Sequence, residues 1–86
     1  MKIEKEYILR EIADDYIIVP VGKTAMEFNG MITVNETGAF LWKLLTKETT
    51  KEELLHAMLE EYEVSAKEAE ADIDEFLQLL KDNQIL

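Results

Sequence analysis

The residues best equipped for chemistry are the single histidine and the carboxylates around it. His56 has Glu52 four residues before it and Glu60 four residues after it, so the three would share one face of a helix. A histidine flanked by carboxylates can bind a divalent cation, but a tetrahedral site needs further His or Cys ligands. The chain has no Cys and no second His. We therefore predict no metal site and expect His56 to be a surface residue of an acidic helix.

A second group of carboxylates, Asp72, Asp74 and Glu75, lies close together in the sequence. Paired carboxylates can act as general acid and base. On a helix, however, Asp72 and Glu75 are neighbours while Asp74 points elsewhere. The three glycines form no phosphate-binding pattern, and no Ser/His/Asp arrangement has support. We therefore expect a solvated helix face, no catalytic residue, no cofactor and no enzymatic activity.

Charge is distributed unevenly along the 86 residues, which are enough for one domain that we expect to span 1–86. Residues 1–34 carry four Lys/Arg and six Asp/Glu, whereas residues 35–86 carry five and thirteen. The net charge of −10 disfavours binding to the phosphates of nucleic acids. It would attract a basic peptide or a basic face of a partner protein, although acidic side chains also serve simply to keep a small domain soluble.

The sequence contains no targeting or membrane-spanning segment that we can identify. The first six residues alternate charges and lack the apolar region of a signal peptide. No apolar run approaches the roughly 18 residues that a spanning helix requires. We expect a cytoplasmic protein that does not associate with membranes.

The first third of the chain has the pattern of a small antiparallel sheet. Residues 7–12 and 16–19 are rich in β-forming side chains, with a plausible turn between them. Met26-Glu27-Phe28 and Met31–Val34 flank Asn29-Gly30, a pair typical of a type I′ hairpin turn. We therefore predict a meander of three or four strands, which needs a helical layer over one face.

The rest of the chain predicts three helices. Asn35 is a good N-cap for a helix that continues to Leu45, in which we expect Trp42 to pack in the core. Thr50-Lys51-Glu52-Glu53 and Ser65-Ala66-Lys67-Glu68 are capping boxes that open the second and third helices. The last helix should run to about Asn83. The fold class is α+β, and elements of this order and size can form a winged-helix-like domain.

Two predicted elements could together form a binding site. If the meander follows sequence order, Met31–Val34 is an edge strand whose free backbone groups must be blocked or used. An extended peptide can use them by adding a strand. On the last helix, Leu79 lies to one side of the apolar stripe that centres near Ile73 and Leu80. If that flank faces the edge strand, the two form a groove; if it faces another element, Leu79 is ordinary core.

The order and spacing of several segments resemble the PqqD family over residues 7–86. The resemblance is carried by the segment from Gly30 to Trp42, by Thr50–Leu54, by Tyr62-Glu63-Val64, and by Asp72–Leu77 with the terminal Ile85-Leu86. One departure is Asn83-Gln84 before Ile85, where such proteins often have a Gly.

This resemblance implies a RiPP recognition element, a winged-helix-like domain that binds the leader of a ribosomally made precursor peptide. It implies that the leader adds a strand beside the third strand and packs against the third of the long helices. The residues that map to this site are Met31, Ile32, Thr33, Val34, Asp72, Phe76, Leu79 and Asn83. It also implies a separate peptide-modifying partner, usually a radical SAM enzyme that carries its own Fe–S cluster. We expect a free-standing adaptor.

Two other functions are compatible with the fold class. An acidic domain could dock on an enzyme and regulate it without contacting substrate. A winged helix could also bind DNA, but residues 66–83 carry only Lys67 and Lys81 against six carboxylates, which disfavours this function. An open edge strand would also permit homodimers.

Overall fold

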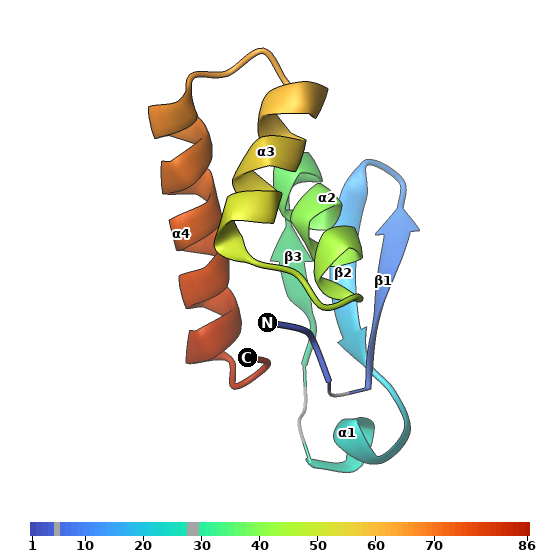
Figure 1. The fold of residues 1–86 in the computed structure, drawn as a ribbon. Coiled ribbons are helices and arrows are strands. Elements are labelled where there is room, and N and C mark those ends of the chain that lie inside the picture. The colour runs from blue at the N-terminus through green and yellow to red at the C-terminus, as the bar shows by residue number, and fades with distance from the viewer. Residues whose placement is uncertain (5, 28–29) are drawn as a thin grey trace.

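The computed structural model describes residues 1–4, 6–27 and 30–86, and it consists of a small sheet covered by helices (Figure 1). The element order is β1 (Tyr7–Ile12), β2 (Asp15–Pro20), α1 (Gly22–Glu27), β3 (Ile32–Val34), α2 (Glu36–Leu45), α3 (Lys51–Glu61) and α4 (Ala66–Asp82). The α+β class, with an N-terminal antiparallel sheet followed by the long helices, is confirmed.

The sheet is antiparallel, with the strand order β1-β2-β3. Ile12 pairs with Asp15, so Ala13 and Asp14 form a two-residue turn between β1 and β2. Ala13 has a φ of +57°, a left-handed conformation that costs energy in any residue with a Cβ. β2 also pairs with β3, with Ile18 opposite Ile32. β3 is therefore an edge strand of the sheet.

The helices begin where the sequence predicts. The Asn35 side chain accepts a hydrogen bond from the backbone N–H of Gly38, which caps α2. The hydroxyls of Thr50 and Ser65 accept equivalent bonds from the N–H groups three residues later and open α3 and α4. The hydroxyl half of each predicted capping box is therefore present, while the carboxylates of Glu53 and Glu68 accept bonds from the hydroxyls of Thr50 and Ser65. These caps place each helix start within one residue of its expected position.

The core lies between one face of the sheet and the layer formed by α2, α3 and α4 (Figure 1). Ile18 and Val34 are the buried side chains of the sheet, and they face a larger set of helical side chains: Ala39, Leu41, Trp42, Leu45, Leu54, Met58, Ala69, Ile73, Phe76, Leu77 and Leu80. Trp42 packs edge-on against Tyr7 with ring centroids 6.2 Å apart, which confirms its predicted place in the core.

One predicted strand is wrong. Met26 and Glu27, expected to begin a strand, lie instead in the short helix α1. Lys23, Ala25 and Met26 are good helix formers, and so short an apolar run does not distinguish the two structures. Thr24, which is buried, also accepts a hydrogen bond from the N–H of Glu6 and ties α1 to the start of β1. Residues 28 and 29, and with them half of the predicted hairpin turn, lie outside the described residues.

The end of α4 shows which backbone conformation the Asn83-Gln84 pair adopts. Gln84 has a φ of +59°, the N–H of Gln84 donates to the carbonyl of Lys81, and the N–H of Ile85 donates to the carbonyl of Leu80. These are the two bonds of a Schellman motif, in which glycine is the usual left-handed residue. The buried side chains of Ile85 and Leu80 accompany it. The chain therefore makes the turn that glycine favours with a glutamine.

Candidate functional site

The candidate site begins at the open edge of β3. One edge of this strand pairs with β2, through Tyr16 with Val34 and Ile17 with Thr33. Within the part of the chain that the structure describes, no strand pairs with its other edge. The predicted edge position is therefore confirmed, and the backbone groups on that side have no strand partner among the described residues.

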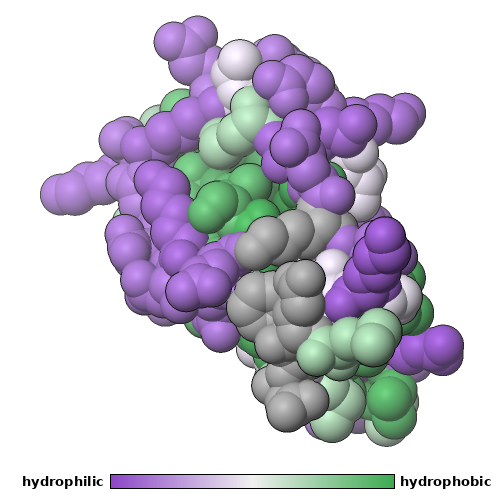
Figure 2. Space-filling model, turned by 90° about the horizontal axis from the view of Figure 1, so that it is seen from below, coloured by the Kyte–Doolittle hydropathy of each residue, from purple (hydrophilic) through white to green (hydrophobic). Residues whose placement is uncertain are grey.

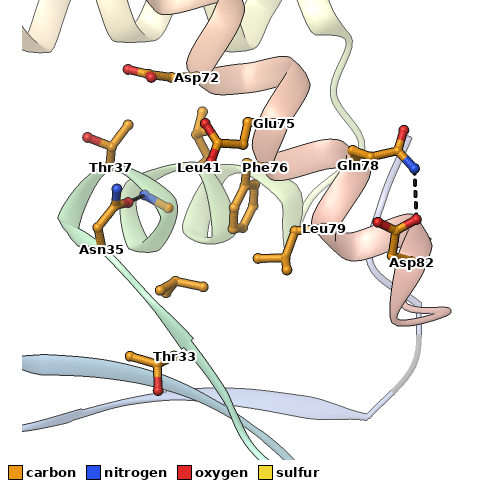
Figure 3. A pocket seen from close by; sticks show the side chains of 12 residues that line it. Thr33, Asn35, Thr37, Leu41, Asp72, Glu75, Phe76, Gln78, Leu79 and Asp82 are labelled. Atoms are coloured by element: carbon orange, nitrogen blue, oxygen red, sulfur yellow. Dashed lines mark hydrogen bonds between the residues drawn. The ribbon is translucent and has the colours of Figure 1, made fainter.

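The C-terminal half of α4 runs alongside this edge and completes a groove of about 490 Å³ (Figure 3). We call it the β3–α4 groove. Its lining residues are Thr33, Val34, Asn35, Thr37, Gly38, Leu41, Asp72, Glu75, Phe76, Gln78, Leu79 and Asp82. Leu79 is half-buried, packs against the core and projects toward β3, so this flank of α4 faces the edge strand. The sequence left this choice open.

The floor of the groove depends on a close approach between α2, β3 and α4. A Cβ on Gly38 would lie 3.1 Å from Cβ of Val34 and 3.2 Å from Cε1 of Phe76, closer than most such contacts. Because Gly38 has no side chain, the start of α2, which Asn35 caps, can pack closely against both β3 and α4. Sequence reasoning did not assign Asn35, Thr37 or Gly38 to a site. A glycine in the first turn of a helix, behind an edge strand, is the signal that could have drawn attention to them.

Part of the accessible surface is a contiguous apolar patch. Seen from below the view of Figure 1, apolar surface gathers in a hollow that hydrophilic side chains border along part of its edge (Figure 2). Met31, immediately before β3, is 66% exposed. Contiguous apolar surface with a polar rim is typical of an interaction site.

A second hollow, of about 640 Å³, lies beside the end of β3. It shares Thr33, Val34 and Asn35 with the β3–α4 groove. Its other lining residues come from the β1–β2 turn region and from the start of α2: Glu11, Asp14, Asp15, Tyr16 and Glu36. We call it the acidic hollow.

The acidic hollow has a negative electrostatic character that affects its tyrosine. The carboxylate of Glu11 is the main cause that raises the pKa of Tyr16, with smaller contributions from burial and from Glu36. A negative charge nearby disfavours the phenolate.

Five of the eight predicted site residues line the β3–α4 groove. These are Thr33, Val34, Asp72, Phe76 and Leu79. The side chain of Ile32 is half-buried and packs against the core. Met31 lies just outside β3 and is exposed. The structure thus brings the helix and strand positions together.

Asn83 lies at the C-cap of α4, and its side-chain amide donates to the carbonyl of Leu79 at 2.8 Å. This bond occupies the amide in closing the helix. Asn83 is not among the described residues that line the groove.

The remaining candidates for chemistry are dispersed. Asp74 bonds Lys51 at 2.5 Å on the side of α4 that faces α3, whereas Asp72 and Glu75 line the groove, as their helical spacing predicts. His56 contacts Glu60 at 2.8 Å on the exposed face of α3. Among the described residues, no three His, Cys, Asp or Glu side chains are grouped so that they could hold a metal ion.

With this geometry described, the chain can be compared with known proteins. The family described as Coenzyme PQQ synthesis protein D (PqqD) matches residues 7–86. The chain belongs to the PqqD family. The predicted resemblance is thus confirmed for nearly the whole length of the sequence.

One solved structure places this PqqD-family fold in context. The structure titled "TbiB1 in Complex with the TbiA(beta) Leader Peptide" is similar, with a TM-score of 0.76 and 24% sequence identity, and the match covers 100% of this chain and 94% of that one. At this identity the likeness shows a shared fold. Among curated proteins, no sequence matches the chain. In the described part of the chain, no helix has the length and apolar character needed to cross a bilayer.

Proposed function

We propose that this PqqD-family chain is a peptide-recognition domain that binds the leader of a ribosomally made precursor peptide. The observation that carries the proposal is the open edge of β3 lying directly beside the apolar flank of α4, where Phe76 and Leu79 project. An extended peptide would pair its backbone with β3 and place alternate side chains against α4. The similar fold of TbiB1, which was solved with a leader peptide, supports this choice of ligand.

The same proposal assigns the chemistry to another protein. The chain acts as an adaptor, a single domain over residues 1–86, that presents the leader to a separate peptide-modifying enzyme such as a radical SAM enzyme. Binding both partners would raise the local concentration of the substrate at the enzyme's active site. The dispersed carboxylates and the surface position of His56 fit a protein that works by binding.

The affinity of the leader should be moderate. A disordered peptide loses conformational entropy when it orders on the strand, and this loss offsets part of the interaction energy. A moderate affinity also suits a carrier that must release its cargo after modification.

The experiment that tests the function starts with a search of the neighbouring genes for a short precursor peptide and a peptide-modifying enzyme. Calorimetric titration of the synthetic leader into the full chain should show one-to-one binding. Addition of the chain should then accelerate modification of the full precursor, and this acceleration should be lost when the leader is removed from the peptide. Enzyme binding and activation that persist without the leader would instead support a regulatory docking module and contradict the proposal.

A further inference from the structure

The face of the sheet that points away from the helices is unusually apolar. Side chains alternate between the two faces along a strand, and residues that pair across strands share a face. Ile18 is fully buried in the core, so its partner Leu9 also faces the helices. The residues between these positions form the opposite face, which we call the outer face: Ile8, Arg10 and Ile12 of β1 with Asp15, Ile17 and Val19 of β2.

The burial of the strand residues agrees with this assignment. The partly buried apolar side chains of the sheet that pack against the core are Tyr7, Leu9, Tyr16 and Ile32. The four apolar side chains of the outer face, all in the described part of the chain, do not pack against that core. Three of them are partly exposed, and Ile12 is 54% exposed. An antiparallel sheet with one face in water usually places polar residues there, so this face is suited to contact another apolar surface.

The outer face is balanced in charge, unlike the chain as a whole. Its two charged residues are Arg10 and Asp15, and both are exposed. Neither takes part in the ion pairs found among the described residues. The excess of carboxylates lies in residues 35–86, which carry five basic and thirteen acidic residues and form the helices on the other side of the sheet (Figure 1). A second copy that approached face to face would therefore meet a neutral surface.

We infer that the outer face is a contact surface for a second copy of this chain. Two sheets can pack face to face about 10 Å apart, and a two-fold axis between them would place Arg10 of each copy opposite Asp15 of the other. The charged pair would then form twice, around contacts between the isoleucines. Strands of this length, about 20 Å, offer a face of only roughly 300 Å² per copy, below the roughly 800 Å² of a stable complex. The dimer should therefore be weak and dependent on concentration.

This contact would leave the peptide groove free. None of the six residues of the outer face is among the described residues that line the β3–α4 groove. Pairing of two β3 edges, in contrast, would occupy the groove. The inference therefore goes beyond the proposed function and does not depend on it.

The test begins with sedimentation velocity of the full chain from about 10 µM to about 1 mM, where a dimer with a dissociation constant of about 1 µM or weaker should be visible. Arg10→Asp and Asp15→Arg each place like charges opposite one another. Because the pair occurs twice and one exposed pair is worth about 1.4- to 5-fold, each variant should dimerise about two- to 25-fold more weakly. An equal mixture of the two variants should associate again, since each supplies the charge that the other has lost. Neither a contact within one chain nor pairing of β3 edges predicts this rescue.

Ile12→Gln tests the apolar part of the contact and should weaken dimerisation by about fivefold or more. Leu59→Gln on α3, where the leucine is 39% exposed, is the matched control and should stay within about twofold of the wild type. Circular dichroism melts show whether all variants are folded. A chain that stays monomeric at the highest concentration, or charge variants that do not rescue one another, would overturn the inference and leave the outer face to a different partner. The leader peptide takes no part in these measurements, so the proposed function would stand.

Discussion

Gly38 and Phe76 approach so closely that a Cβ on Gly38 would lie 3.2 Å from Cε1 of the phenylalanine ring. This contact joins the start of α2 to the flank of α4 and leaves the space above it for the β3–α4 groove. The width of the groove therefore depends on a residue that has no side chain.

Replacing Gly38 by valine should destabilise the protein and narrow the groove. The added methyl groups would collide with Val34 and Phe76, and overpacking of this kind costs about 1–3 kcal/mol. Urea denaturation measures the loss, and peptide affinity should fall as well. Ala71→Val on the exposed face of α4 is the matched control, with a cost of about 0.7 kcal/mol at most from helix propensity. Equal stability of the two variants would show that a valine fits at position 38 without overpacking.

Leu79 should matter more for binding than for folding. It is half-buried, so Leu79→Ala removes only part of a core side chain but most of the apolar surface that α4 offers at its end of the groove. We expect about five- to tenfold weaker peptide binding, in line with the loss of about 1 kcal/mol of apolar contact. Leu59→Ala on α3, where the leucine is 39% exposed, should leave affinity unchanged. Calorimetric titration measures the peptide affinity of both variants. Equal affinities would contradict a role for Leu79 in binding.

The titration of Tyr16 should report the field of the acidic hollow. Its pKa is raised chiefly by Glu11, so in the folded chain the phenol should lose its proton above the ordinary value of 10.0. Since the unfolded chain then deprotonates first, stability should decrease as the pH rises through 10. NMR titration of the Tyr16 ring measures the pKa, which should move back toward 10 in Glu11→Gln. An unchanged pKa in that variant would remove Glu11 as the cause.

Ala13→Gly should stabilise the β1–β2 turn. Alanine adopts a φ of +57° there, which costs about 1–2 kcal/mol relative to a right-handed conformation and costs glycine little. Because glycine also makes the unfolded chain more flexible, the net gain in the free energy of unfolding should be about 0.5–1 kcal/mol. Thermal or urea denaturation measures it. A destabilised variant would mean that the turn does not strain Ala13.

The sequence predicts most of the elements because their signals are local. Asn35, Thr50 and Ser65 each bond an N–H three residues ahead, so the cap and the helix start lie in one short stretch. Met26 shows the limit of local signals, since its segment suits a strand and a helix equally and the contact of Thr24 with Glu6 is not visible in the local pattern. The groove could not be predicted in full, because it depends on contacts between residues far apart in the sequence. Whether Leu79 faces β3 depends on how α4 packs, and the role of Gly38 depends on its contacts with Val34 and Phe76.

The most direct test of strand addition is residue-resolved amide hydrogen exchange of the chain with and without its cognate leader peptide. β1 is the opposite edge of the same sheet, so it serves as an internal control. If the leader extends the sheet at β3, amides within residues 31–34 should exchange much more slowly in the complex, α4 signals over residues 72–83 should shift, and the β1 amides should be unaffected. Binding that leaves the β3 amides unprotected, or that protects β1 instead, would contradict the account.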